Sequence, residues 1–188
     1  MKVLATLVAA MMVAGSVLAI DPSKKKSVLY TPGNWMFNVG LGMPTGDHED
    51  AGVDTMVLVG LDYGLGNIGD GSNASTYVGM AGLFGSGDGD FESRSWGGHY
   101  GVIFGLSDAS GNSPVYIKLQ GGYYNGRIDF GTTDDDKWGF GGQAGIIWMP
   151  RRGGNDIRVE IGYYMMPSVS SVNNNGWFLG IGIPFQSR

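Results

Sequence analysis

Cysteine is absent from this 188-residue chain, which excludes disulfide bonds, thiolate metal sites, a cysteine nucleophile and a lipoprotein anchor. Charge is also scarce, because charged residues make up 15% of the chain against a usual share of about 25%. With 12% aromatic residues the chain has enough apolar surface to fold, and its net charge of -5 argues against a nucleic-acid partner. Beyond the first twenty residues no apolar run reaches the ~18 residues that a membrane-spanning helix needs.

Glycine, by contrast, is abundant, with 35 residues and no three-residue period, so a collagen helix is excluded. The length predicts a single folded domain. Residues 1–19 have the features of a secretory signal peptide: Lys2, an apolar stretch over residues 3–14, and small residues at the end. A retained membrane anchor is the alternative, but the apolar stretch is shorter than the ~20 residues it needs. We expect a basic tail over residues 20–33 and one folded domain over residues 34–188.

Large apolar residues alternate with glycine or polar residues in eight segments, and this period of two is typical of strands whose sheet has two different faces. The segments begin about 20 residues apart, which favours long strands over the shorter ones of a sandwich. In the third segment both faces are partly apolar. Expected strand starts lie near Trp35, Val53, Ser75, Trp96, Val115, Trp138, Ile157 and Trp177.

The volumes of the side chains decide which face points inward. Eight strands leave an interior that side chains just fill, so four or five bulky residues from each strand would not fit there. Turning the sheet over places small and polar residues inside and the apolar band toward lipid. The sequence therefore predicts an all-β fold, an eight-stranded antiparallel up-and-down transmembrane β-barrel with a polar, Gly-rich lumen.

The aromatic residues sort to the strand ends, as expected of the two interfacial girdles of a membrane barrel. Enrichment of Trp and Tyr in strands explains their presence but not this sorting. The girdle predicted at one rim is Trp35, Tyr63, Phe104, Trp148 and Phe185, and the girdle predicted at the other is Trp96, Tyr123, Trp138, Tyr163 and Trp177.

With this pattern, and with a final segment WFLGIGIPF that ends in an aromatic residue, the chain resembles the small outer-membrane β-barrels of the OmpA transmembrane-domain and OmpX type, a group that includes porin-family and opacity-type proteins. The resemblance implies a Gram-negative-type outer membrane, assembly machinery that reads the last strand, periplasmic termini and longer loops outside. The expected outer loops are residues 44–52, 85–95, 124–137 and 166–176. They are acidic, with Arg94, Arg127 and Lys137 as their basic residues.

Charges on the inward face are expected to share one level near the inner end and to form a hydrogen-bonded network, because isolated buried charges are costly. The predicted network consists of Asp62, Lys118, Arg158 and Glu160, with Gln120 and Gln143 satisfying the remaining groups. In the alternative, these side chains reach water at the rim and never meet.

Catalytic and metal signals are weak. His99 is the one plausible base, with Ser93 and Ser95 nearby in sequence and Glu92 to orient it, but a hydrogen-bonded lumen histidine explains it as well. His48 is expected to be a solvated loop residue. The segment GSGDGDFES offers Asp88, Asp90 and Glu92 as a weak calcium site, without EF-hand spacing.

The sequence therefore predicts a non-enzymatic, cofactor-free outer-membrane protein with a structural or surface-interaction role and a plugged lumen. Its expected partners are the lipid bilayer, surface lipopolysaccharide and the outer-membrane assembly machinery, and it is expected to be a monomer. Two alternatives stay open: a lipid-modifying acyl hydrolase that uses His99, and a narrow conduit for small or apolar solutes.

Overall fold

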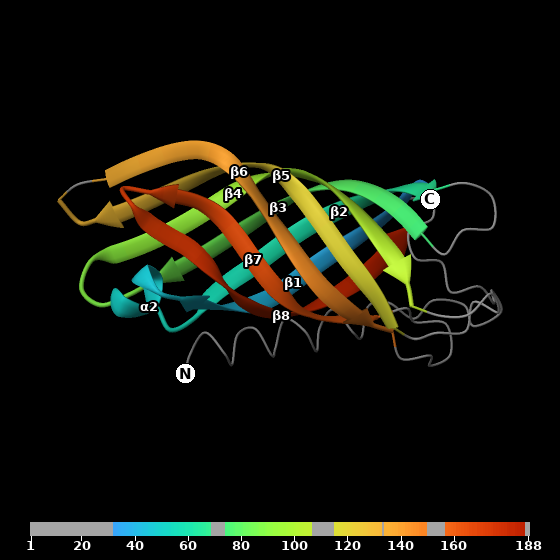
Figure 1. Ribbon diagram of the computed structural model, residues 1–188, viewed down its shortest axis with the longest axis horizontal. Coiled ribbons are helices and arrows are strands. Elements are labelled where there is room, and N and C mark those ends of the chain that lie inside the picture. Colours follow the sequence, from blue (N-terminus) through green and yellow to red (C-terminus); the bar gives the residue numbers. More distant parts are fainter. Residues whose placement is uncertain (1–31, 69–73, 107–114, 133, 150–156, 187–188) are drawn as a thin grey trace.

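The computed structural model describes residues 32–68, 74–106, 115–132, 134–149 and 157–186, which form one closed barrel (Figure 1). The expected signal peptide, most of the expected tail and the last two residues lie outside the described residues. Eight strands follow one another around the barrel: β1 (Asn34–Thr45), β2 (Met56–Asn67), β3 (Ala74–Ser86), β4 (Phe91–Gly105), β5 (Val115–Phe130), β6 (Asp134–Trp148), β7 (Arg158–Val169) and β8 (Val172–Gln186). A four-residue helix, α2 (Asp47–Asp50), lies between β1 and β2.

Each strand pairs antiparallel with its neighbours in sequence, and β1 pairs with β8 from Asn34↔Gln186 to Thr45↔Asn175, which closes the barrel. The predicted eight-stranded up-and-down barrel is therefore confirmed. Within the described part of the chain, no helix is both long and apolar enough to span a bilayer.

The outer wall is apolar along most of every strand. Met80 is 60% exposed, Ile161 53% and Leu119 48%, although each has the size and chemistry of a core residue. Soluble monomers rarely expose contiguous apolar patches larger than a few hundred Å², so an apolar surface that runs around a closed barrel is typical of a wall that contacts lipid.

The inner face is Gly-rich for a steric reason. A Cβ built on Gly101 would lie 2.2 Å from the Tyr77 ring, and one on Gly97 would lie 2.8 Å from the Tyr124 ring. Both tyrosines are fully buried, and each lies close to the glycine with which it pairs on the neighbouring strand, where a larger residue would clash with the ring. Glycine on the inner wall thus makes room for a few large side chains from other strands.

The expectation of a polar lumen is correct only for the inner part. The outer half holds an apolar core that includes the buried side chains of Met56, Leu83, Tyr124, Tyr164 and Phe178. A smaller apolar cluster around Met36, Tyr77 and Ile103 lies among the polar residues of the inner half. Strands with apolar residues on both faces carry this core, which the alternation pattern alone does not reveal.

The expected long outer loops are mostly strand. β3 and β4 are joined by residues 87–90, β5 and β6 by residues 131–133, and β7 and β8 by Ser170 and Ser171. These two serines have φ of 48° and 67°, the positive values of a tight two-residue hairpin turn, at positions where glycine or asparagine usually signals one. The strands continue outward beyond the apolar band, and the sequence of these outer strand ends is polar, as it usually is in loops.

The segment between β1 and β2 is the exception, because it folds over the outer end of the barrel. The second strand was expected to start near Val53, but Val53 precedes β2 and is fully buried in the outer apolar core. Gly52, with φ of 76°, brings this segment against Asp88 of the β3–β4 turn.

One strand keeps an unpaired edge. β6 pairs with β7 only from Gly142 to Trp148, so its outer residues 134–141 pair with β5 alone among the described residues. Pro167 of β7 has no N–H to continue the ladder, and the β7–β8 register shifts between Met166 and Val169. The ladder between the two strands ends there (Figure 1), although Pro167 stays close to Gly139 and the Ser170 hydroxyl donates a hydrogen bond to Asp135.

Candidate functional site

The inner lumen contains a buried acid–imidazole pair that joins three strands. His99 of β4 places Nε2 2.8 Å from Asp62 Oδ1 of β2, and both side chains are 1% exposed. Asn38 Nδ2 of β1 donates to the other carboxylate oxygen at 2.8 Å. The imidazole Nε2–H therefore donates to Asp62, and Nδ1 has no partner among the described residues.

An ion pair lies on the other side of the lumen. Lys118 Nζ of β5 donates to Glu160 Oε2 of β7 at 3.1 Å, with side chains 5% and 9% exposed. Lys118 Nζ also lies 5.8 Å from the centre of the Tyr77 ring. Glu160 Oε1 has no hydrogen-bond partner in the described part of the chain, so the bond from Lys118 is the one hydrogen bond that the structure gives this carboxylate there.

Gln120 links the polar residues to the aromatic ones. It accepts a hydrogen bond from Tyr77 Oη at 3.0 Å and donates to Tyr124 Oη at 3.3 Å. Gln143 lies opposite Gln120 in the register, but its Nε2 has no partner within the described ranges. The buried Arg158 is 2% exposed and enters the lumen from the inner end of β7.

Among the residues of the predicted network, Lys118 pairs with Glu160. Asp62 contacts His99 and Asn38, which were not in the prediction. Sequence reasoning placed His99 on the inner face but offered Glu92, not Asp62, as the acidic residue that orients it. Its contact with Asp62 depends on the register of β2, β3 and β4, where Asp62 and His99 both pair with Gly79.

A second buried histidine fastens the outer end of the barrel. His48 of α2 is fully buried, which corrects the expectation of a solvated loop residue. Its Nδ1 lies 2.8 Å from the backbone oxygen of Asn173, and its Nε2 lies 2.7 Å from Ser93 Oγ. Asp47 accepts the backbone N–H of Asn173 at 2.8 Å. We call these four residues, Asp47, His48, Ser93 and Asn173, the outer clasp.

The tautomer of His48 follows from its partners. The Asn173 carbonyl can only accept, so Nδ1 carries the proton, and Nε2 of the neutral ring accepts from the Ser93 hydroxyl. No sequence pattern signals these contacts, since Ser93 is 45 residues and Asn173 125 residues from His48. They tie α2 to β4 and β8.

The clasp is expected to loosen in acid. Burial lowers the pKa of His48 below its usual value of 6.5, against the opposing effects of the Asn173 carbonyl and of Asp47. Below pH 6.5 the unfolded segment therefore binds more protons than the folded one, so stability is complete above 6.5 and decreases as the pH falls toward the folded pKa.

Amide hydrogen exchange of residues 46–53 and of Asn173 measures this opening. Exchange should accelerate by up to about tenfold per pH unit below 6.5, after correction for intrinsic rates. His48→Gln should remove the additional acceleration. Equal pH profiles for the original chain and for His48→Gln would contradict the assignment.

The arrangement of serines and histidines bears on the hydrolase alternative. His99 contacts Asp62 and packs edge-to-face with the Tyr77 ring, and neither of these partners is a serine. Ser95 Oγ accepts a hydrogen bond from Asn174, and the exposed Glu92 lies 3.7 Å from Arg94. The Ser–His contact that does form, between Ser93 and His48, is buried under α2 beside the Phe91 ring.

The outer end of the barrel is acidic. Asp88, Asp90 and Glu92 are exposed there, and no group of three potential metal ligands forms among the described residues. Arg127 pairs with Asp134, and Asn125 Nδ2 donates to Asp136 at 3.1 Å. Carboxylates therefore outnumber the cations Arg94, Arg127 and Lys137 at this end.

The aromatic residues lie in two groups on the outer wall. Near the inner end, Trp35 pairs with both Tyr63 and Phe185, and the Trp35 and Tyr63 ring centres are 4.9 Å apart. Phe104 and Trp148 lie toward the same end of their strands. Toward the outer end, three ring pairs have centres 5.3 to 5.6 Å apart: Trp96–Trp138, Tyr123–Trp138 and Tyr163–Trp177.

The fold is similar to that of solved small outer-membrane barrels, as the sequence resemblance predicts at the level of fold. The crystal structure of Ail, the attachment invasion locus protein of Yersinia pestis, has a TM-score of 0.57 and 16% identity, and the match covers 82% of this chain and 100% of Ail. Neisserial surface protein A has a TM-score of 0.56 and 16% identity, with 82% of this chain and 97% of that chain covered.

Ail in complex with the heparin analogue sucrose octasulfate has a TM-score of 0.52 and 14% identity, over 82% of this chain and 100% of that one. No protein-family model and no curated protein matches the sequence. At these identities the likeness concerns the fold alone.

Proposed function

We propose that the chain is an outer-membrane protein with a surface-interaction or structural role, exported by a signal peptide over residues 1–19 that is then removed. One observation carries the proposal: the barrel exposes apolar side chains between two aromatic groups and buries other apolar and polar side chains in its interior. A wall of this kind is suited to lipid, and a filled lumen leaves the strand ends as the working surface.

The lumen supports a plug rather than a conduit. The apolar core of the outer half and the polar pairs of the inner half occupy an eight-stranded interior that is only wide enough for side chains. In planar bilayers we expect no large, stable conductance from the purified chain. Porin-like steps from the unmodified protein would contradict the plug and favour the conduit.

The charge of the outer end supports a cationic partner. The Ail structure holds a sulfated, polyanionic sugar analogue. The outer end of this chain carries the run Asp134, Asp135 and Asp136, all exposed, on the unpaired edge of β6. A polyanion would be repelled there, whereas lysine-rich segments or amines would be attracted.

Cells that display the protein on their outer membrane provide the test. We expect them to bind fluorescent oligolysine in a salt-sensitive way, and to bind sucrose octasulfate no better than cells without the protein. Neutralising Asp135 and Asp136 to Asn should weaken oligolysine binding, whereas Asp54→Asn, outside the run, should have little effect. Tighter binding of the sulfated sugar than of oligolysine would overturn this charge-based proposal.

The other proposed partners follow from the proposed position of the barrel in the outer membrane. The lipid bilayer contacts the apolar wall, surface lipopolysaccharide surrounds the outer aromatic group, and the assembly machinery reads the β8 residues Trp177 to Phe185. We propose a monomer without cofactor or catalytic activity. Phospholipase and deacylase assays on the purified chain should show no hydrolysis that depends on His99, and loss of an activity in His99→Ala would favour the hydrolase instead.

A further inference from the structure

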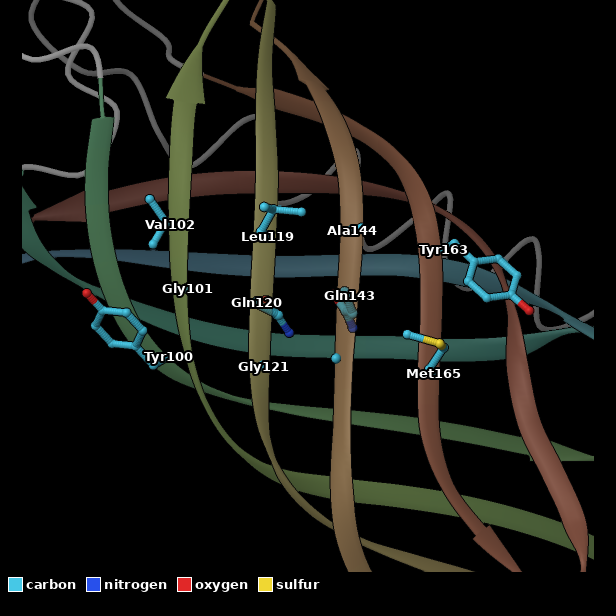
Figure 2. Close-up of a pocket in the computed structure, with 11 residues that line it drawn as sticks. Tyr100, Gly101, Val102, Leu119, Gln120, Gly121, Gln143, Ala144, Tyr163 and Met165 are labelled. Atoms are coloured by element: carbon cyan, nitrogen blue, oxygen red, sulfur yellow. The ribbon is translucent and has the colours of Figure 1, made fainter.

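A hollow of about 440 Å³ lies on the apolar wall of the barrel, across strands β4 to β7. Tyr100 stands on one side, Tyr163 and Met165 stand on the other, and Leu119 and Ala144 lie along its length (Figure 2). The outward side chains at its border are apolar apart from the two tyrosine hydroxyls, and Gln120 and Gln143 also line the hollow.

Two glycines, Gly121 and Gly142, form the floor of the hollow. One row of the register reads Tyr100↔Gly121↔Gly142↔Met165, so two adjacent strands present bare backbone between two large residues. The glycines differ in what they tolerate. A Cβ on Gly121 would meet nothing within 4 Å, whereas one on Gly142 would lie 2.6 Å from the backbone oxygen of Gln120. Gly121 therefore opens the hollow without any steric need inside the barrel.

The depth of the hollow matches the middle of the apolar band. On β4, Tyr100 is four residues from Trp96 of the outer aromatic group and four from Phe104 of the inner one. On β6, Gly142 lies between Trp138 and Trp148. The hollow is continuous with the wall that we propose faces lipid, so hydrocarbon is the medium that reaches it.

We propose that the hollow seats one hydrocarbon chain of a membrane lipid, held longer than the chains around the rest of the wall. A chain lying on Gly121 and Gly142 contacts backbone below and the side chains of Tyr100 and Met165 on both sides, which gains dispersion contacts that a convex wall does not offer. The inference rests on the proposed function, because it requires the wall to lie in a bilayer.

The surroundings favour a chain over a second copy of the protein and select no particular head group. A stable protein interface buries about 1,200 to 2,000 Å² of well-packed surface, and Phe140, 87% exposed and two residues from Gly142, projects where a second wall would approach. Above the outer aromatic group, Arg94 and Arg127 already have the carboxylate partners Glu92 and Asp134. The hollow is therefore expected to bind a lipid through contacts with its hydrocarbon chain and not through the charge of its head group.

Photolabelling in nanodiscs tests the seat. The probes are phosphatidylcholine and phosphatidylglycerol, each with one acyl chain that carries a diazirine near its middle, and adducts are mapped by mass spectrometry. With both probes we expect several-fold more adducts at Leu119, Tyr163 and Met165 than at Val59 and Leu179, which lie in the apolar band on β2 and β8.

Gly121→Leu should fill the hollow and reduce its labelling to the level of Val59 and Leu179. The matched control is Gly98→Leu, which adds the same side chain at an outward glycine of β4 that lies outside the hollow and has only one atom within 4 Å of its Cβ. It should leave the pattern unchanged. Both variants are first checked for heat-modifiable mobility in gels, the sign of a folded barrel.

Equal labelling of the hollow and of the reference positions in the unmodified chain would overturn the seat while leaving the membrane placement intact. Absence of labelling over the whole wall would overturn the proposed function itself. A hollow that is labelled only by phosphatidylglycerol would also contradict the inference, because it would show selection by the head group.

Discussion

Replacing Lys118 with Met is expected to destabilise the barrel by about 3 to 5 kcal/mol, the usual cost of leaving one member of a buried ion pair without its partner. Glu160, the partner of Lys118, is buried. The Glu160 carboxylate accepts a hydrogen bond from Lys118, and its other oxygen has no partner among the described residues. Met has nearly the same length, so the effect reports the lost charge more than lost volume.

The double variant Lys118→Met/Glu160→Gln separates the charge from the packing. It should recover most of the lost stability, because no uncompensated charge remains in the lumen. Urea unfolding in lipid vesicles, followed by tryptophan fluorescence, measures both variants. If Lys118→Met costs about 1 kcal/mol or less, the pair behaves as a solvated rim pair and the lumen is hydrated there.

Replacing Ile161 with Arg is expected to cost about 2 to 4 kcal/mol in the same assay, because a charge would face the middle of the bilayer. Ile161 is 53% exposed on the outer wall and pairs with Ile146 and Leu179, which are also exposed. In water, the same substitution at so exposed a position would be nearly neutral.

Phe84→Arg is the matched control. Phe84 is exposed on the same wall, but it pairs with Arg94, beyond the row that contains Trp96. Near the interface the substitution should cost about 1 kcal/mol or less. Equal costs for the two variants would show that depth along the wall makes no difference, contrary to the proposed position of the bilayer.

The alternation of large and small residues predicted the strand order and the closed barrel because a strand places alternate side chains on opposite faces. It was less informative where both faces are apolar. Leu83 and Tyr77 alternate with Met80 and Phe84 on β3, and only the closed barrel shows that the first two fill the lumen. The alternation within a single strand does not show how much interior space the other seven strands leave.

The outer ends were the least predictable part. Beyond the apolar band the outward face of a strand becomes polar, so residues 124–130 and 134–137 read as loop although they are paired strand. The outer clasp joins residues from three distant segments, and the hollow depends on Gly121 and Gly142 becoming neighbours in the register. Such contacts are properties of the assembled barrel and leave no local signal.

The most direct test of the account is the medium that surrounds the apolar wall. Because the chain has no cysteine, a single nitroxide label can be placed through Ile146→Cys, and a second through Asp134→Cys in a separate variant. In vesicles, collision rates with oxygen, which concentrates in lipid, and with a water-soluble nickel chelate are measured by electron paramagnetic resonance. The account predicts that the label at residue 146 collides mainly with oxygen and the label at residue 134 mainly with the chelate. A label at residue 146 that collides mainly with the chelate would contradict it.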